Sequence, residues 1–343
     1  MNFTRMNFAD TARRAAALAV FCTVAWAPHA QAQPVALAAP SASAPRSVND
    51  WLMRMHEASR HRSYIGTFVV SSGGVMSSAK IWHACQDDQQ VERVETLTGP
   101  PRSVFRHNDQ VLTFLPDQKL VISEKRESLG MFPALLRSTD TRIGDFYAAR
   151  QGLVERVAGV EADIVELQPK DDLRFGYRVW VEQKNGLVVK LQTLDLQGSV
   201  LEQAAFSELQ LDAPVKMSKL LKLMAKSDGY RVSRPALVPT TASAEGWALK
   251  SPVAGFKSMS CLKRVSGGAG SSEPMQWIFS DGLATVSLFV EPFDKLRHRE
   301  EASLAMGATH TMTRRIDDYW LTVMGEVPDA TLRRFASGLE RRK

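Results

Sequence analysis

The sequence is poor in cysteine and has no apolar run long enough to cross a membrane. Only 3 of its 343 residues are cysteines, so a fold that depends on disulfides is excluded. The early apolar segment from Ala15 to Ala27 spans 13 residues, whereas a transmembrane helix needs about 20. With 44% hydrophobic and 23% charged residues, the composition is that of a globular protein and excludes disordered or collagen-like chains.

Motifs for catalysis and metal binding are also missing. We find no nucleophile elbow, no His-Glu-x-x-His helix and no Cys or His pair at metal-ligand spacing. The neighbouring carboxylates Asp171-Asp172 and Asp317-Asp318 lie at predicted borders of loops and strands, where turn formation is their ordinary role. We therefore expect no enzyme, no metal ion and no cofactor. An unrecognised hydrolase ranks behind the two functions that are considered below.

The basic residues do not form a nucleic-acid-binding pattern. The formal net charge of +6 suits an acidic partner, an anionic lipid or neither. From Phe293 onward, 10 Lys and Arg residues accompany 8 acidic residues, so solvated or ion-paired surfaces are the expected role of these arginines. We predict no nucleic-acid partner, although lipid phosphates would suit the same side chains.

The first residues have the features of a secretory signal peptide. Three arginines among the first 14 residues precede the apolar run, and an Ala-Gln-Ala sequence ends at Ala32. We expect cleavage after Ala32 and export to the periplasm. Cys85 and Cys261 would then meet an oxidising compartment, where they either form a disulfide or, as we favour, remain two buried thiols.

Composition and patterning divide the chain into five predicted segments. These are a signal peptide (1–32), a flexible leader (33–46), a large β domain (47–210), a linker (211–246) and a smaller C-terminal domain (247–343). A helix is expected from Ser47 or Asn49 onward, because apolar residues recur there at helical spacing. Short β-type segments follow up to about residue 208. They predict an antiparallel sheet with one solvent-facing side, to which we assign Lys190 and Gln192.

The C-terminal segment predicts a second β-rich unit closed by a helix. Asp281-Gly282 is a strong hairpin-turn signal between two strands. After Pro328, apolar residues recur at helical spacing, namely Leu332, Phe335, Ala336 and Leu339. We expect this helix to bury one stripe of side chains against the strands.

The apolar segment from Met131 to Leu136 interrupts the strand pattern. Its proline and the flanking Gly130 and Arg137 predict a short helix. Such a helix either packs in the core or forms a lid over an apolar cavity. The sequence leaves both interpretations open.

A series of motifs, in order along both predicted domains, resembles the MucB/RseB family. The first domain contributes Tyr64-Ile65-Gly66-Thr67-Phe68-Val69, Leu115-Pro116-Asp117, Arg156-Val157-Ala158-Gly159, Pro169-Lys170-Asp171 and Gly176-Tyr177-Arg178-Val179-Trp180. The second contributes Ser280-Asp281-Gly282-Leu283-Ala284-Thr285-Val286-Ser287, Met306-Gly307-Ala308 and Gly325-Glu326-Val327-Pro328. An ordered series over nearly all of the mature chain is more specific than any single motif.

This resemblance implies a fold and a function. The implied fold is β-rich α+β, with an N-terminal unclosed antiparallel β-barrel similar to the LolA/LolB carriers, helices over its concave face, and a smaller C-terminal α+β domain. The implied function is to bind the periplasmic region of a transmembrane anti-sigma factor and shield it from site-1 proteolysis. Lipopolysaccharide or another lipid would release the regulator and so control the envelope stress response. The alternative is a periplasmic lipid or lipoprotein carrier, because fold does not fix function.

Candidate site residues follow from these expectations. Acyl chains need an apolar wall, for which the candidates are Phe68, Trp82, Phe114, Met131, Phe132, Leu135 and Leu136. For the anti-sigma partner the second domain is favoured. Strand alternation there turns Phe289 away from Val286 and Leu288, and an exposed aromatic residue is a plausible contact. The candidate partner contacts are Phe289, Arg314 and Arg315, and a homodimer stays open.

Overall fold

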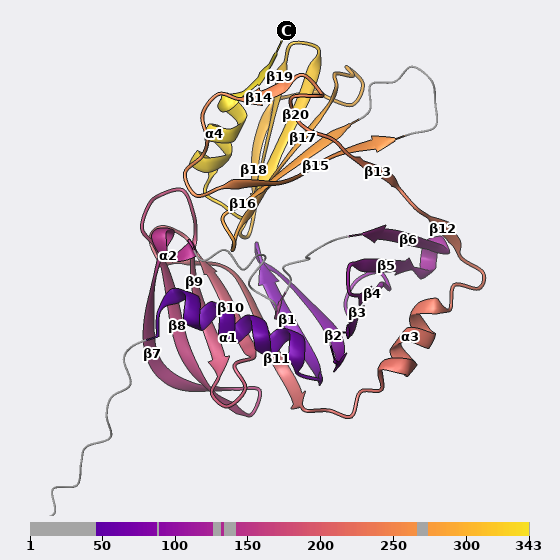
Figure 1. Ribbon diagram of the computed structural model, residues 1–343, viewed down its shortest axis with the longest axis vertical. Coiled ribbons are helices and arrows are strands. Elements are labelled where there is room, and N and C mark those ends of the chain that lie inside the picture. Colours follow the sequence, from indigo (N-terminus) through magenta and orange to yellow (C-terminus); the bar gives the residue numbers. More distant parts are fainter. Residues whose placement is uncertain (1–45, 88, 126–131, 134–141, 266–273, 343) are drawn as a thin grey trace, which may run out of the picture. The chain divides into compact units, whose positions relative to one another are not determined.

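The computed structural model describes residues 46–87, 89–125, 132–133, 142–265 and 274–342 (Figure 1). The predicted signal peptide and nearly all of the predicted leader lie outside these ranges, as do Met131, Leu135 and Leu136. Phe132 and Pro133 lie in a turn, and the rest of the segment predicted as a short helix lies outside the described residues. None of the described helices combines the length and apolar character that crossing a bilayer requires.

Helix α1 (Val48–His61) begins where the sequence supplies a complete cap. The Asp50 backbone N–H donates to the Ser47 hydroxyl at 3.2 Å, and the Ser47 backbone N–H donates to the Asp50 carboxylate at 2.9 Å. This capping box satisfies N–H groups that a helix start leaves unpaired. The predicted apolar face of the helix is buried, including Trp51, Leu52 and Met55.

Twelve strands form one large, unclosed sheet (Figure 1). They are β1 (Tyr64–Ser72), β2 (Val75–Gln86), β3 (Gln89–Thr96), β4 (Ser103–His107), β5 (Gln110–Leu115), β6 (Leu120–Lys125), β7 (Tyr147–Val157), β8 (Val160–Pro169), β9 (Gly176–Glu182), β10 (Val188–Leu194), β11 (Val200–Leu211) and β12 (Arg231–Ser233). The short helices η1 (Pro116–Gln118) and α2 (Ile143–Phe146) lie between strands.

The strand order of this sheet is β12-β6-β5-β4-β3-β2-β1-β11-β10-β9-β8-β7. Every pair is antiparallel except β12 with β6, which is parallel. In the part of the chain that is described, the end strands β12 and β7 do not pair with each other. The predicted β-rich fold with an unclosed N-terminal sheet is therefore confirmed.

Helices cover this sheet from both faces. Side chains alternate along a strand and directly paired residues share a face, so the pairing register places Phe68 on the same face as Val165 and Val179. Helix α1 packs on this face, which we call the α1 face, in one cluster with both valines. Helix α3 (Met217–Ala225) buries Leu220 and Met224 on the opposite face, over β2 to β6. We call this the α3 face.

One detail of the predicted solvent-facing side is wrong. Gln192 on β10 is buried, and its side-chain amide donates to Gln203 Oε1 at 2.6 Å. Lys190 is half-buried, with its ammonium group 4.1 Å from the centre of the Trp180 ring. Polar side chains on this side pair with neighbours on adjacent strands, which an alternation pattern cannot reveal.

A separate, smaller antiparallel sheet has the order β13-β15-β16-β17-β20-β19-β18. Its strands are β13 (Ala236–Pro239), β15 (Lys257–Val265), β16 (Met275–Ser280), β17 (Thr285–Pro292), β18 (Ala302–Met306), β19 (Thr309–Ile316) and β20 (Tyr319–Gly325). A two-stranded pair joins β14 (Trp247–Leu249) to β21 (Leu339–Arg341). Helix α4 (Asp329–Gly338) buries Leu332 and Phe335 against the core face of this sheet, so the predicted C-terminal helix is confirmed.

A buried ion pair joins a loop after β8 to the turn between β16 and β17. Arg174 Nε donates to Asp281 Oδ2 at 2.9 Å, and neither side chain has exposed surface. Asp281 Oδ1 also accepts hydrogen bonds from the backbone N–H groups of Leu283 and Ala284. The carboxylate therefore holds the turn that the Asp281-Gly282 dipeptide predicts.

Candidate binding surfaces

Two of the apolar candidates meet on the α1 face of the large sheet. The ring centroids of Phe68 and Phe132 lie 5.4 Å apart. Both rings also contact Phe206 of β11, at 6.2 Å from Phe68 and 4.9 Å from Phe132. The sequence-based candidates did not include Phe206, whose position opposite Phe68 follows only from the pairing of β1 with β11.

Trp82 and Phe114 lie on the opposite face. Trp82 of β2 pairs directly with Ile65 of β1. Ile65 is three positions from Phe68 along β1, so side-chain alternation places Ile65 and Trp82 on the α3 face, opposite Phe68. Phe114 is buried there beside Phe105 and Tyr230, with ring centroids 5.4 and 5.5 Å away. The expectation of one apolar wall containing Phe68, Trp82 and Phe114 is therefore corrected, because the sheet itself separates them.

A half-covered apolar row crosses four strands of the α1 face. Val94, Val104, Thr113 and Ile122 are directly paired in succession from β3 to β6, and each is only half-buried. Arg106 stands in the next row, where its guanidinium lies 3.4 Å from the Glu92 carboxylate. Three of its four side chains, those of Val94, Val104 and Ile122, are apolar and only partly buried.

The small sheet also has an incompletely covered face, which we call the outer face. Val286, Leu288 and Val290 are buried on the core face, and Phe289 points the opposite way and is half-buried. The outer face further carries exposed apolar side chains of Leu304, Met306 and Met324. Alternation along β17 thus follows the predicted pattern.

The two arginines proposed as partner contacts lie apart from one another. Arg314 is on the core side of β19, where its guanidinium donates to the Ala336 carbonyl of α4 at 3.2 Å. Arg315 is on the outer side, with its guanidinium 4.0 Å from the centre of the Phe293 ring. Arg314 therefore stabilises the end of α4, whereas Arg315 lies on the same face of the sheet as Phe289.

Both cysteines in the described residues are free thiols. Cys85 is half-buried, and its sulfur lies 3.7 Å from the Ser63 hydroxyl. Cys261 is buried, and burial raises the pKa of its thiol to about 11. Such a thiol is poorly nucleophilic at neutral pH, because the thiolate is the reactive form. The described residues also contain no cluster of three or more His, Cys, Asp or Glu side chains suited to a metal ion.

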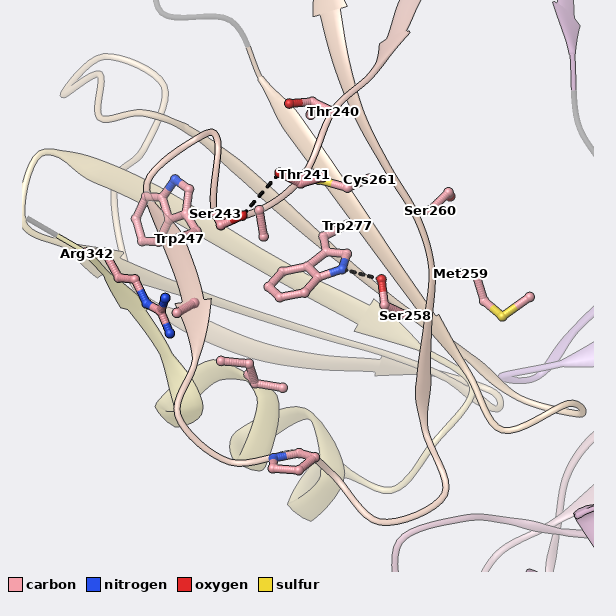
Figure 2. Close-up of a pocket in the computed structure, with 14 residues that line it drawn as sticks. Thr240, Thr241, Ser243, Trp247, Ser258, Met259, Ser260, Cys261, Trp277 and Arg342 are labelled. Atoms are coloured by element: carbon pink, nitrogen blue, oxygen red, sulfur yellow. Dashed lines mark hydrogen bonds between the residues drawn. The ribbon is translucent and has the colours of Figure 1, made fainter.

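A pocket of about 650 Å³ opens on the small sheet, where the sequence did not indicate a binding site (Figure 2). Its walls come from the segment after β13, from β14 and β15, and from Trp277 of β16 and Arg342 near the C-terminus. The Trp277 indole N–H donates to the Ser258 hydroxyl at 2.8 Å, which fixes the ring at the pocket wall (Figure 2). The volume lies within the range of small-ligand pockets, about 300 to 1,000 Å³.

Comparison with protein families matches both parts of the chain. Residues 47–224 match the MucB/RseB N-terminal domain, and residues 241–340 match the MucB/RseB C-terminal domain. Two curated relatives are regulatory proteins by name. The sigma factor AlgU regulatory protein MucB of Pseudomonas aeruginosa is 28% identical over 300 residues, which cover 84% of this chain and 89% of the relative. The sigma-E factor regulatory protein RseB of Haemophilus influenzae is 24% identical, with coverage of 84% and 89%.

Solved structures of MucB are also similar to this chain. MucB in complex with MucA(peri) superimposes with a TM-score of 0.66 at 26% identity, covering 86% of this chain and 98% of that one. A second complex, that of Pseudomonas aeruginosa MucA/MucB, gives a TM-score of 0.67 at 25% identity, covering 86% and 99%. The likeness thus extends over most of the chain.

Proposed function

The chain belongs to the MucB/RseB family, and from this premise we propose that it is a periplasmic regulator that binds the periplasmic region of a transmembrane anti-sigma factor. One observation carries the proposal: the similarity to MucB in its complex with MucA(peri) covers 86% of this chain. The bound regulator would shield the anti-sigma factor from site-1 proteolysis. It acts by binding and carries out no catalysis.

The outer face of the small sheet is the proposed docking surface for the anti-sigma factor. Phe289 offers a rigid aromatic side chain at the middle of this face, and aromatic residues in such positions often dominate binding energy. Exposed Leu304 and Met306 extend the apolar surface along the edge strand β18. Exposed apolar side chains grouped on one face are typical of protein-binding surfaces.

A titration with the purified periplasmic segment of the cognate anti-sigma factor tests this proposal. We expect tight binding by calorimetry, and Phe289→Ala should weaken it by about tenfold or more. Leu196→Ala is the matched control, because Leu196 is an exposed leucine in the turn between β10 and β11 of the large sheet. Light scattering of the free protein tests the homodimer that the sequence leaves open.

Lipid release is the second part of the proposal. Acyl chains would contact the half-covered row from Val94 to Ile122 on the α1 face, and lipid phosphates would pair with nearby basic side chains such as Arg106. We expect lipopolysaccharide to weaken anti-sigma binding. If the protein binds lipid and shows no detectable binding of the anti-sigma segment, the regulator proposal is wrong and the carrier alternative takes its place.

A further inference from the structure

Helix α3 carries a concentrated positive charge that the function proposed above does not use. The 15 residues from 213 to 227 contain no Asp or Glu and four lysines, which are Lys216, Lys219, Lys222 and Lys226. This segment therefore has a charge of +4 in a chain whose formal net charge is +6. We propose that these four lysines, which we call the lysine face, dock the protein on the surface of an anionic phospholipid bilayer.

The lysine face points away from the large sheet. Leu220 and Met224 of α3 are buried against the sheet. Residues three or four positions apart lie on the same side of a helix, so Lys219, Lys222 and Lys226 form one stripe on the side turned away from these two residues. All three lysines are exposed. The stripe therefore presents three ammonium groups to a partner outside the molecule.

The charge of the lysine face is not neutralised by its surroundings. In the part of the chain that the structure describes, none of the four lysines takes part in an ion pair or donates a side-chain hydrogen bond. The nearest acidic residues along the chain are Asp212 and Asp228, and Asp212 pairs with Arg62 at 3.4 Å. By contrast, Lys250 and Lys263 pair with glutamates of the small domain. An uncompensated positive surface of this kind attracts an anionic one.

The stability of α3 does not explain the lysines at its start. Lys216 is the N-cap residue and forms no side-chain capping bond, and the first turn, which contains Lys219, has no acidic residue. A positive charge near a helix N-terminus is unfavourable, because the N–H groups there already carry partial positive charge. Helix α1 has the favourable arrangement, with Ser47 and Asp50 at its start. An anionic partner would benefit from both the lysines and the helix dipole.

The arrangement fits the surface of a bilayer and not its interior. The apolar side of α3 is already packed on the large sheet, so the helix cannot insert among acyl chains as a free amphipathic helix does. Contact is then confined to the headgroups. Each lysine close to an anionic bilayer strengthens binding by about fivefold. A row of separated ammonium groups matches the spaced phosphates of a lipid surface.

The lysine face is separate from the other surfaces considered above. It lies on the α3 side of the large sheet, opposite the half-covered apolar row from Val94 to Ile122. Phe289 belongs to the small sheet. Docking on a bilayer therefore does not depend on binding of an anti-sigma factor. If both occur, docking would concentrate the protein beside a partner that is anchored in a membrane.

Cosedimentation of the mature chain with vesicles tests the proposal. We expect binding to vesicles of equal parts phosphatidylglycerol and phosphatidylethanolamine, no binding to phosphatidylcholine vesicles, and loss of binding in about 0.5 M NaCl, where charges are screened. Joint replacement of Lys219, Lys222 and Lys226 by glutamine should weaken binding by about 100-fold.

A second triple variant is the matched control. It replaces three exposed basic residues outside α3 by glutamine, and so removes the same net charge. These residues are Lys184, Lys295 and Arg334. We expect this variant to bind the vesicles within about threefold of the parent, because most of the attraction acts within a Debye length. Equal weakening by the two triple variants would show that only the overall charge matters and would overturn the proposal.

Lys219→Glu separates docking from a structural role. An acidic residue in the first turn of a helix is favourable, so this variant should unfold at no lower urea concentration than the parent. Its vesicle binding should nevertheless fall by about 25-fold, because a positive charge is replaced by a negative one. Unchanged vesicle binding by this variant would contradict the proposal.

Two further results would assign the lysine face to another partner and overturn the proposal. Binding of lipopolysaccharide micelles through these lysines, with no binding of phospholipid vesicles, would identify lipopolysaccharide phosphates as the ligand. Loss of anti-sigma binding in the α3 triple variant, with vesicle binding retained, would identify a protein-binding surface. Phe289→Ala should leave vesicle binding unchanged, which separates this result from the fate of the anti-sigma proposal.

Discussion

The Asp281 carboxylate stabilises both a turn and a buried cation. Its Oδ1 accepts two backbone N–H groups, and its Oδ2 accepts Nε of the fully buried Arg174. Asp281→Asn keeps an acceptor for the turn but removes the charge. Breaking a buried pair typically costs about 3 to 5 kcal/mol, and the lower end applies here because Arg174 keeps a second carboxylate partner, that of Asp171. We expect a loss of about 3 kcal/mol in the free energy of unfolding by urea.

An exposed ion pair provides the control for this substitution. Arg315 and Asp318 lie 3.9 Å apart, and the Asp318 side chain is 96% exposed. Because solvent screens such pairs, Asp318→Asn should change stability by less than about 1 kcal/mol. Equal effects of the two substitutions would contradict a stabilising role for the buried pair.

His83 predicts a pH dependence of stability. Its ring stacks on Tyr64 with centroids 5.0 Å apart, and burial lowers the pKa of His83 below its ordinary value of 6.5, although Glu92 opposes this shift. Below pH 6.5 the unfolded chain therefore binds more protons than the folded one. Above this pH, His83 does not reduce the free energy of unfolding. As the pH falls towards the lowered pKa, the free energy of unfolding decreases by at most about 1.4 kcal/mol per pH unit.

Urea unfolding of the parent and of His83→Gln, at about pH 7.5 and about pH 5.5, measures this contribution. The variant should lose less stability than the parent between these two conditions. The stability of the variant should still depend on pH to some extent, because burial also lowers the pKa values of His56 and His310. Identical pH dependence in parent and variant would show that His83 does not titrate differently on folding.

Single residues show how far the sequence alone can predict a site. The face to which Phe289 points was predictable because alternation along one strand decides it. The position of Arg314 was not, because its guanidinium binds a carbonyl of α4 that is 22 residues away. The separation of Phe68 from Trp82 required the register between β1 and β2, which depends on both strands together.

At the scale of an element, helix α3 shows what the sequence alone predicts and what it does not predict. Its amphipathic pattern was visible in the segment treated as a linker, but the surface that it covers was not. Leu220 is buried over β2 and β3, whereas Leu223 of the same helix is 37% exposed. Leu220→Ala should cost about 2 to 5 kcal/mol of unfolding free energy, because it leaves a cavity, and Leu223→Ala should cost far less.

Both substitutions remove the same atoms and change helix propensity equally. The difference between their effects on the free energy of unfolding therefore reports only how α3 packs on the large sheet. Urea unfolding with a single probe on each variant measures this difference. Similar losses for both variants would mean that α3 does not pack on the sheet. A loss confined to Leu220→Ala would make this segment part of the core of the large sheet.

At the scale of the whole molecule, the strand-rich architecture was predictable and the pocket was not. Short alternating segments and turn residues indicate strands wherever they occur, and capping residues such as Ser47 mark helix starts. The pocket draws on residues 240–261, on Trp277 and on Arg342, which are far apart in the sequence. No local pattern links such segments, and only the pairing of β15 with β16 and of β14 with β21 brings them together.

The proposed regulation by lipid makes a quantitative prediction for the complete protein. If lipopolysaccharide lowers the affinity for the anti-sigma segment by some factor, that segment must lower the affinity for lipopolysaccharide by the same factor. Calorimetry with each ligand, in the absence and presence of the other, measures both factors. Ile122→Glu places a charge in the half-covered apolar row and should abolish the coupling, while anti-sigma binding without lipid stays unchanged. Unequal factors would mean that the lipid acts on the anti-sigma segment itself, for example by absorbing it into micelles, and that this protein is not the sensor.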